Sequence, residues 1–129
     1  MEFTYFAKVD SKSNIVCYVT QVQNDFILDE NGNVSIELGL NHLKNSFDDF
    51  DEYLWVNITE NTGVCNLNYL YLPDYNKFVP EKPYNSWILN METFDWEPPI
   101  PIPSDSNSDT KAYIWVDEAR IWVGKNLVQ

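Results

Sequence analysis

The chain has 129 residues, of which 44% are hydrophobic and 16% aromatic, so it can bury a core without metal ions or disulfides. Twenty acidic residues against eight Lys and Arg give a formal net charge of −12, which would repel nucleic-acid phosphates and anionic membranes. We therefore expect one folded chain that binds neither nucleic acid nor a membrane.

The thiols and the histidine form no metal-binding motif. Cys17 and Cys65 are far apart in the sequence, neither belongs to a CxxC pair, and His42 is the single histidine. We expect no metal, no cofactor and two free thiols made in a reducing cytosol, with one disulfide as the alternative. The chain begins without a basic, apolar leader and has no apolar run of about 18 residues, so we expect neither classical export nor membrane insertion.

Two short β-favouring runs open the chain. Residues 5–9 and 15–19 are rich in β-branched and aromatic side chains, and the polar residues 10–14 between them suit a turn. This pattern predicts an antiparallel hairpin, with residues 19–22 extending its second strand.

One segment has the period of a helix. Its apolar residues recur at i, i+4, i+7 and i+11 and fall on one helical face: Ile36, Leu40, Leu43 and Phe47. Ser35 stands where an N-cap residue is expected. We predict a single amphipathic helix that begins after Ser35 and ends near Phe47.

Strand signals return after the helix. Residues 53–59 alternate apolar and polar side chains, and residues 65–72 do so again after a turn, so both are predicted strands. The rest of the chain is rich in aromatic residues and in prolines, with Pro80 and Pro83 in one connector and four prolines among residues 98–103. Prolines at alternate positions favour an extended polyproline II backbone.

These elements predict an α+β, mostly β fold of antiparallel hairpins with one amphipathic helix and Pro-rich extended connectors. The composition changes at the first proline-rich connector, so we expect an N-terminal α+β domain at residues 1–79. Residues 80–129 would form aromatic β-hairpins, either extended from the first part or packed on it.

The second half of the chain repeats an aromatic spacing. Three aromatic pairs are each nine positions apart and bracket a turn: Tyr69 and Phe78, Trp87 and Trp96, and Tyr113 and Trp122. In the middle pair, residues 90–93 suit a four-residue hairpin loop. A chain with 16% aromatic residues also produces such spacings by chance, so a true repeat and a coincidence of composition are both open.

No residue pattern points to catalysis. Residues 29–32 resemble part of a calcium loop, but aligning Gly32 with the loop glycine puts Ile27 and Leu38 where carboxylates are required. No Ser or Cys stands in a nucleophile motif, and nothing selects a catalytic pair among the acidic residues. We therefore expect that the protein is not an enzyme.

Four tryptophans form the one candidate functional group: Trp87, Trp96, Trp115 and Trp122. On hairpins, such residues anchor a protein interface or stack on sugars, because each buries roughly 150–250 Å² at low entropy cost. The simpler interpretation, which we favour, is that they fill the core of hairpins that are short of aliphatic residues. Trp115 and Trp122, nearest the C-terminus, are the better candidates for a partner contact.

Several blocks along the chain share a wider pattern. The blocks are residues 5–10 with 15–16, 29–35 with 38–40, 78–90 with 96–101, and 113–115 with 117–118. The block FVPEKPYNSWILN at residues 78–90 is the most specific. In these blocks the chain resembles a small, uncharacterised, structural-type protein family of tailed bacteriophages that infect marine bacteria.

The resemblance carries no catalytic residues and implies a place in the virion, after synthesis in the bacterial host cytoplasm. We expect a non-enzymatic structural protein, most simply a capsid decoration or cement accessory, with a tail, baseplate or fibre-attachment adaptor as the alternative. Its partners would be other virion proteins, capsid or tail subunits, met by a homo-oligomer or by many copies. A carbohydrate-binding module that uses the four tryptophans on host glycans is a second alternative.

Overall fold

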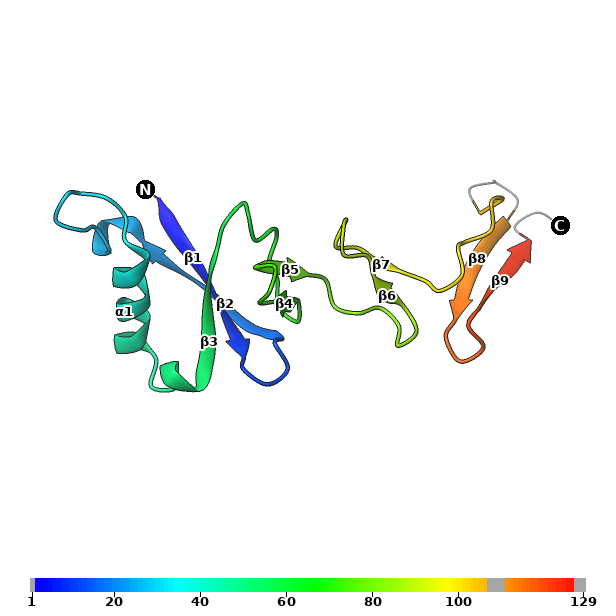
Figure 1. The fold of residues 1–129 in the computed structure, drawn as a ribbon, viewed down its shortest axis with the longest axis horizontal. Helices are drawn as coiled ribbons and strands as arrows, with labels where there is room; N and C mark the ends of the chain where they lie inside the picture. Colours follow the sequence, from blue (N-terminus) through cyan, green and yellow to red (C-terminus); the bar gives the residue numbers. More distant parts are fainter. Residues whose placement is uncertain (1, 107–110, 127–129) are drawn as a thin grey trace. The chain divides into compact units, whose positions relative to one another are not determined.

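The computed structural model describes residues 2–106 and 111–126, and Figure 1 shows their elements in chain order. The chain divides into two compact units, Met1–Glu81 and Lys82–Gln129, so the division lies two residues later than the boundary expected between residues 79 and 80. The predicted fold class is confirmed, because the chain is mostly β, is made of antiparallel hairpins, and has one α-helix among its described residues.

A three-stranded antiparallel sheet organises the first unit. β1 (Phe3–Asp10) is its central strand, with β2 (Val16–Gln23) on one side and β3 (Tyr53–Ile58) on the other (Figure 1). As predicted, β1 and β2 form a hairpin. Phe6 and Ala7 point to opposite faces of β1 and are both fully buried, so both faces of the sheet are covered.

The helix α1 (Ile36–Ser46) packs against one face of this sheet. It begins as predicted at Ser35, whose hydroxyl accepts a hydrogen bond from a backbone N–H of the first turn at 3.2 Å. Leu43 is buried in the same cluster as Phe6. Gly39 allows this close approach, because a Cβ at this position would lie only 2.8 Å from Cζ of the buried Phe6 ring.

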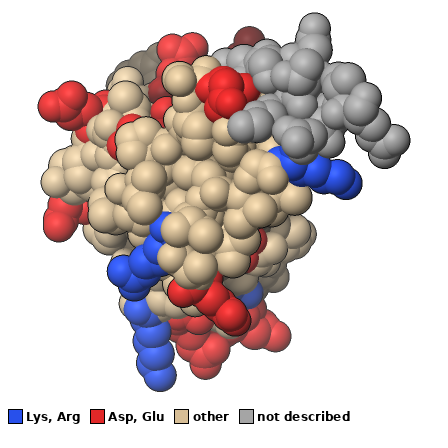
Figure 2. Space-filling model, turned by 90° about the vertical axis from the view of Figure 1, so that its right-hand side faces the viewer, with Lys and Arg blue, Asp and Glu red and all other residues tan. Residues whose placement is uncertain are grey.

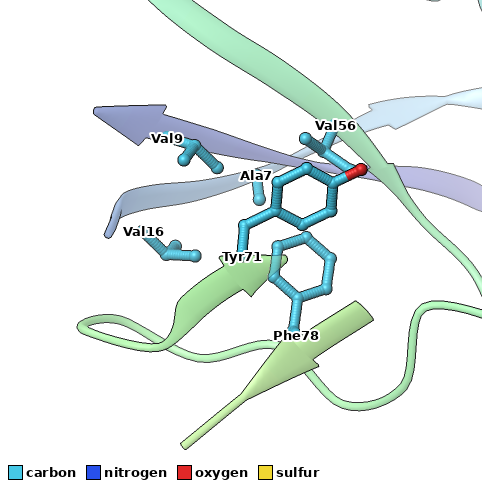
Figure 3. Close-up of a cluster of buried hydrophobic side chains, with 6 residues drawn as sticks. All are labelled: Ala7, Val9, Val16, Val56, Tyr71 and Phe78. Atoms are coloured by element: carbon cyan, nitrogen blue, oxygen red, sulfur yellow. The ribbon is translucent and has the colours of Figure 1, made fainter. Parts of the chain in front are cut away.

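A short hairpin covers the other face of the sheet. β4 (Leu70–Leu72) and β5 (Lys77–Val79) place the rings of Tyr71 and Phe78 against aliphatic side chains of the sheet, among them Val9 (Figure 3). The two ring centroids are 5.0 Å apart. An isolated hairpin of this length is marginally stable, so its stability depends on this aromatic contact with the sheet.

The predicted strand at residues 65–72 is wrong over its first part, because only Leu70–Leu72 pairs as a strand. Asn68 has a φ of 69°, a left-handed conformation that is foreign to strands. Its backbone N–H donates to the carbonyl of Val16 at 2.9 Å, so the segment turns beside β2 instead of extending. Asn68 occupies a polar position of the alternating pattern, and the pattern therefore does not reveal the turn.

Two hairpins provide the described strands of the second unit, and each is a two-stranded sheet. One pairs β6 (Ile88–Leu89) with β7 (Trp96–Glu97), and the other pairs β8 (Lys111–Val116) with β9 (Ile121–Asn126). Both hairpins lie where the sequence predicts them. The strands of the first hairpin are shorter than those of the second.

The turn of the β6–β7 hairpin comprises residues 91–94 rather than the predicted 90–93. The backbone N–H of Asn90 donates to the carbonyl of Asp95 at 2.8 Å and closes this turn. The side-chain oxygen of Asn90 also accepts hydrogen bonds from two backbone N–H groups inside the turn. Phe94, the residue that follows the predicted loop, is therefore the last residue of the turn.

Four hairpins of the chain share this kind of turn. Each turn has four residues, and its last residue has a φ between 51° and 61°: Asn14, Asn76, Phe94 and Arg120. In the three aromatic hairpins, the first residue of each nine-residue pair lies four positions before the turn, and the second lies two positions after it. Within the described residues, the spacing therefore marks a structural repeat.

Candidate functional site

Three tryptophans of the second unit meet in one cluster. Trp115 and Trp122 are directly opposite each other on β8 and β9, and their ring centroids are 5.2 Å apart. Trp87, just before β6, has its ring centroid 6.2 Å from that of Trp115 and 6.3 Å from that of Trp122. The two hairpins of this unit are therefore joined through edge-to-face tryptophan contacts.

Asp117, the residue after β8, holds the same junction with its carboxylate. One carboxylate oxygen accepts hydrogen bonds from the indole N–H of Trp115 at 3.0 Å and from the backbone N–H of Ser86 at 3.3 Å. The Ser86 hydroxyl donates to the same oxygen. Together these bonds hold the pKa of Asp117 below its usual value, and the hydrogen bond from the Ser86 hydroxyl has the largest effect. The carboxylate thus ties the start of one hairpin to the turn of the other.

The four tryptophans proposed from the sequence have different surroundings. Trp115 is 5% exposed and belongs to the core, which agrees with the simpler interpretation for this residue. Trp87 and Trp122 are half-buried and line a pocket. Trp96 is not part of the cluster of three, and the Lys82 ammonium lies 5.7 Å from its ring centroid. The structure therefore brings together three of the four residues.

A pocket of about 450 Å³ opens beside the cluster. Its lining consists of two indoles, three residues of the proline-rich segment and one acid: Trp87, Trp122, Pro98, Pro101, Ile102 and Glu97. The indole N–H of Trp122 donates to the carbonyl of Ile100 at 2.9 Å, so this segment is held against the ring. The prolines, which we expected to act as an extended connector, also form a wall of the pocket.

The indole nitrogen of Trp87 is buried and has no hydrogen-bond partner within the described residues. The ring of Trp87 meets those of Trp115 and Trp122 at 81° and 61°, angles at which an edge faces a ring surface. An N–H group on such an edge interacts weakly with the aromatic face. Because the nitrogen is buried, it is not a group that the pocket offers to a ligand.

The β8–β9 hairpin carries apolar side chains on both faces. The tryptophans lie on one face, and β-branched residues paired across the strands lie on the other, Ile114 with Val123 and Val116 with Ile121. We call these four residues the outer face; they are 61%, 45%, 36% and 47% exposed in that order. In the space-filling view of Figure 2, uncharged residues make up most of the coloured surface.

The sequence prediction does not include the outer face, although a signal for it exists. Residues 113–116 and 121–123 are continuous apolar runs that lack the alternation of a strand with one wet face. Such runs indicate strands that are covered on both sides. The sequence prediction considers only the large tryptophans of these runs and therefore assigns no function to the aliphatic residues beside them.

The remaining reactive groups do not form a second site in the part of the chain that the structure describes. There, no three His, Cys, Asp or Glu side chains are grouped to hold a metal ion, and no helix is long and apolar enough to span a membrane. Cys17 and Cys65 are free thiols, as the sequence predicts, and do not form the disulfide that was the alternative. Burial raises the pKa of Cys65 to about 11, so this thiol is protonated near neutral pH.

No family model matches the chain, and no curated protein and no solved structure is significantly similar to it.

Proposed function

We propose that this protein is a non-enzymatic structural component of a tailed bacteriophage particle, attached to the capsid as a decoration or cement accessory. The outer face of the β8–β9 hairpin carries the proposal. A two-stranded sheet that buries tryptophans on one side and exposes four β-branched side chains on the other is suited to packing against a further protein surface. The phage origin rests on the sequence resemblance.

The core of the second unit supports the same conclusion. Among its described residues, Trp115 is the one buried hydrophobic side chain, whereas the first unit has two clusters of buried residues. Two-stranded hairpins with so little core gain stability when a third layer or a further strand covers them. The second unit is therefore the part that we expect to attach, and repeated attachment on a particle adds avidity.

A protein partner fits the pocket better than a sugar does. Sugar sites combine aromatic faces with several polar groups that match the hydroxyls of the ring. The lining of the pocket among the described residues is made of prolines, an isoleucine and two tryptophans, with Glu97 as the one acidic residue. The geometry therefore supports protein contact over the carbohydrate-binding alternative.

Purified virions of the phage that encodes this chain test the proposal. We expect mass spectrometry to detect the protein in the particles, and cryo-electron microscopy to place its density on the capsid lattice. Density that follows three- or six-fold tail symmetry would favour the adaptor role at the tail, baseplate or fibre. Absence of the chain from purified virions would contradict both roles.

A further inference from the structure

The pocket beside the tryptophan cluster combines two aromatic rings with one acidic group. Trp87 and Trp122 provide the rings, and Glu97, an exposed residue of β7, provides the carboxylate. This carboxylate accepts a hydrogen bond from the side-chain amide of Asn90 at 3.0 Å. None of the described residues that line the pocket is basic. Aromatic faces beside a carboxylate attract a cation, because the ring quadrupole and the negative charge both favour it.

The first unit contains a filled arrangement of the same kind. The Lys8 ammonium donates a hydrogen bond to the Asp49 carboxylate at 2.7 Å and lies 4.1 Å from the ring centroid of Tyr53. The ring centroids of Phe47 and Trp55 lie 5.8 Å and 6.0 Å from it. The hydrogen bond to Asp49 raises the pKa of Lys8, so the ammonium stays charged among these rings. Aromatic rings and one carboxylate therefore suffice in this chain to hold a basic side chain.

We propose that the pocket formed by Trp87, Trp122 and Glu97 receives a basic side chain, preferentially arginine, from an extended segment of a partner protein. This inference rests on the proposed function only for the identity of that partner. The net charge of −12 favours a basic partner over a second copy of the chain. Arginine is preferred to lysine because its planar guanidinium stacks on an indole while its N–H groups bind a carboxylate in pairs.

The walls of the pocket indicate an extended backbone around that side chain. Pro98, Pro101 and Ile102 provide an apolar wall, and a volume of about 450 Å³ leaves room for residues that flank the basic one. The indole N–H of Trp122 already binds the carbonyl of Ile100, as an indole binds an extended, proline-rich backbone in peptide-recognition grooves. We therefore expect apolar residues or prolines on both sides of the basic residue.

Titration of the full chain with short capped peptides tests the pocket. The probes are three-residue peptides that hold arginine, lysine or norleucine between two prolines, and the readout is the indole N–H signals of the five tryptophans in NMR spectra. We expect the arginine peptide to shift the signals of Trp87 and Trp122. It should bind at least about 5-fold more tightly than the norleucine peptide, with the lysine peptide in between.

A matched pair of variants isolates the carboxylate. Glu97→Gln keeps the size of the side chain and removes its charge, so it should weaken binding of the arginine peptide roughly 5-fold and leave the norleucine peptide unchanged. Glu92→Gln changes an exposed acid of the same hairpin outside the pocket lining and should have no effect.

Equal binding of the three peptides, equal effects of the two variants, or unshifted signals of Trp87 and Trp122 would overturn the inference. Because this assay uses purified protein without virions, its result is independent of the test for a place in the particle. Loss of peptide binding would leave the virion proposal standing, and absence from virions would leave the pocket chemistry standing.

Discussion

At the scale of single residues, the carboxylate of Asp117 connects the two hairpins of the second unit. It accepts hydrogen bonds from Ser86 at the start of one hairpin and from Trp115 in the other. Hydrogen bonds to an ionised carboxylate are stronger than those to a neutral acceptor. Folding therefore favours the ionised form of Asp117, and protonation weakens the junction.

The stability of the second unit should for this reason fall at acidic pH. The pKa of Asp117 is lower in the folded chain than in the unfolded chain, so its contribution to stability is present above the unfolded value, about 4, and is lost as the pH falls through the folded value. We expect the urea midpoint, followed by tryptophan fluorescence, to decrease more steeply below about pH 4 for the wild type than for Asp117→Asn.

Two variants separate this effect from the general action of acid on a chain with many carboxylates. Asp117→Asn keeps the shape of the side chain but cannot ionise, so it should be less stable than the wild type at pH 7 and should approach it in acid. Glu118→Gln changes the neighbouring exposed acid and should retain the wild-type pH profile. A wild-type profile in Asp117→Asn would contradict the role of this carboxylate.

At the scale of elements, the four-residue turn recurs with a left-handed last residue. Two of the four turns have asparagine there, which tolerates this conformation better than most residues. Arg120 has a φ of 54° and an exposed side chain, and its backbone N–H donates to the carbonyl of Asp117 at 3.2 Å. The Cβ of Arg120 therefore adds a steric cost to a turn whose backbone is otherwise paired.

Replacing this arginine with glycine should stabilise the β8–β9 hairpin. We expect Arg120→Gly to raise the free energy of unfolding by about 0.5–1 kcal/mol, because glycine adopts the left-handed conformation without a clash of Cβ. Ala119→Gly is the control, because Ala119 is an exposed neighbour without a positive φ. This substitution should lower the free energy of unfolding by a similar amount, since the glycine only adds freedom to the unfolded chain. Urea unfolding at constant pH measures both, and a less stable Arg120→Gly would contradict the strain.

The elements could be predicted from the sequence where their signals are local. The helix follows from apolar spacing and from the cap at Ser35, and the hairpins follow from β-favouring runs around polar turns. The sequence predicts the turn that ends at Phe94 one residue too early, because several polar residues there suit a turn equally well. The predicted strand at residues 65–72 is too long for a similar reason. The polar Asn68 fits the alternating pattern of a strand, although its positive φ turns the chain.

The candidate site was predicted less completely, because it depends on contacts between distant residues. The sequence singles out the tryptophans as a group, but the contacts that join Trp87, Trp115 and Trp122 follow from how one hairpin packs on the next. Glu97 and the proline wall join the pocket through the same packing. No spacing along the chain encodes these contacts, whereas the apolar runs at 113–116 and 121–123 did contain a signal for the outer face.

At the scale of the whole molecule, the two units differ in how they are stabilised. The first unit buries a sheet between a helix and a hairpin, with both faces covered. The second unit has little buried core among its described residues and exposes the outer face of the β8–β9 hairpin. We infer a division of roles, in which the first unit folds around its own core and the second provides the surfaces for a partner.

The most direct test of this account is the number of copies of an outer-face variant in purified virions. Ile114→Asp places a charge on the proposed contact, and Val64→Asp, at a 72% exposed position of the first unit, is the matched control. Quantitative mass spectrometry relative to the major capsid protein should show that the number of Ile114→Asp copies per virion falls about 10-fold or more. The tryptophan fluorescence of the purified variant should be unchanged. Val64→Asp should be incorporated as the wild type is. Wild-type incorporation of Ile114→Asp, or equal losses of both variants, would contradict attachment through this face.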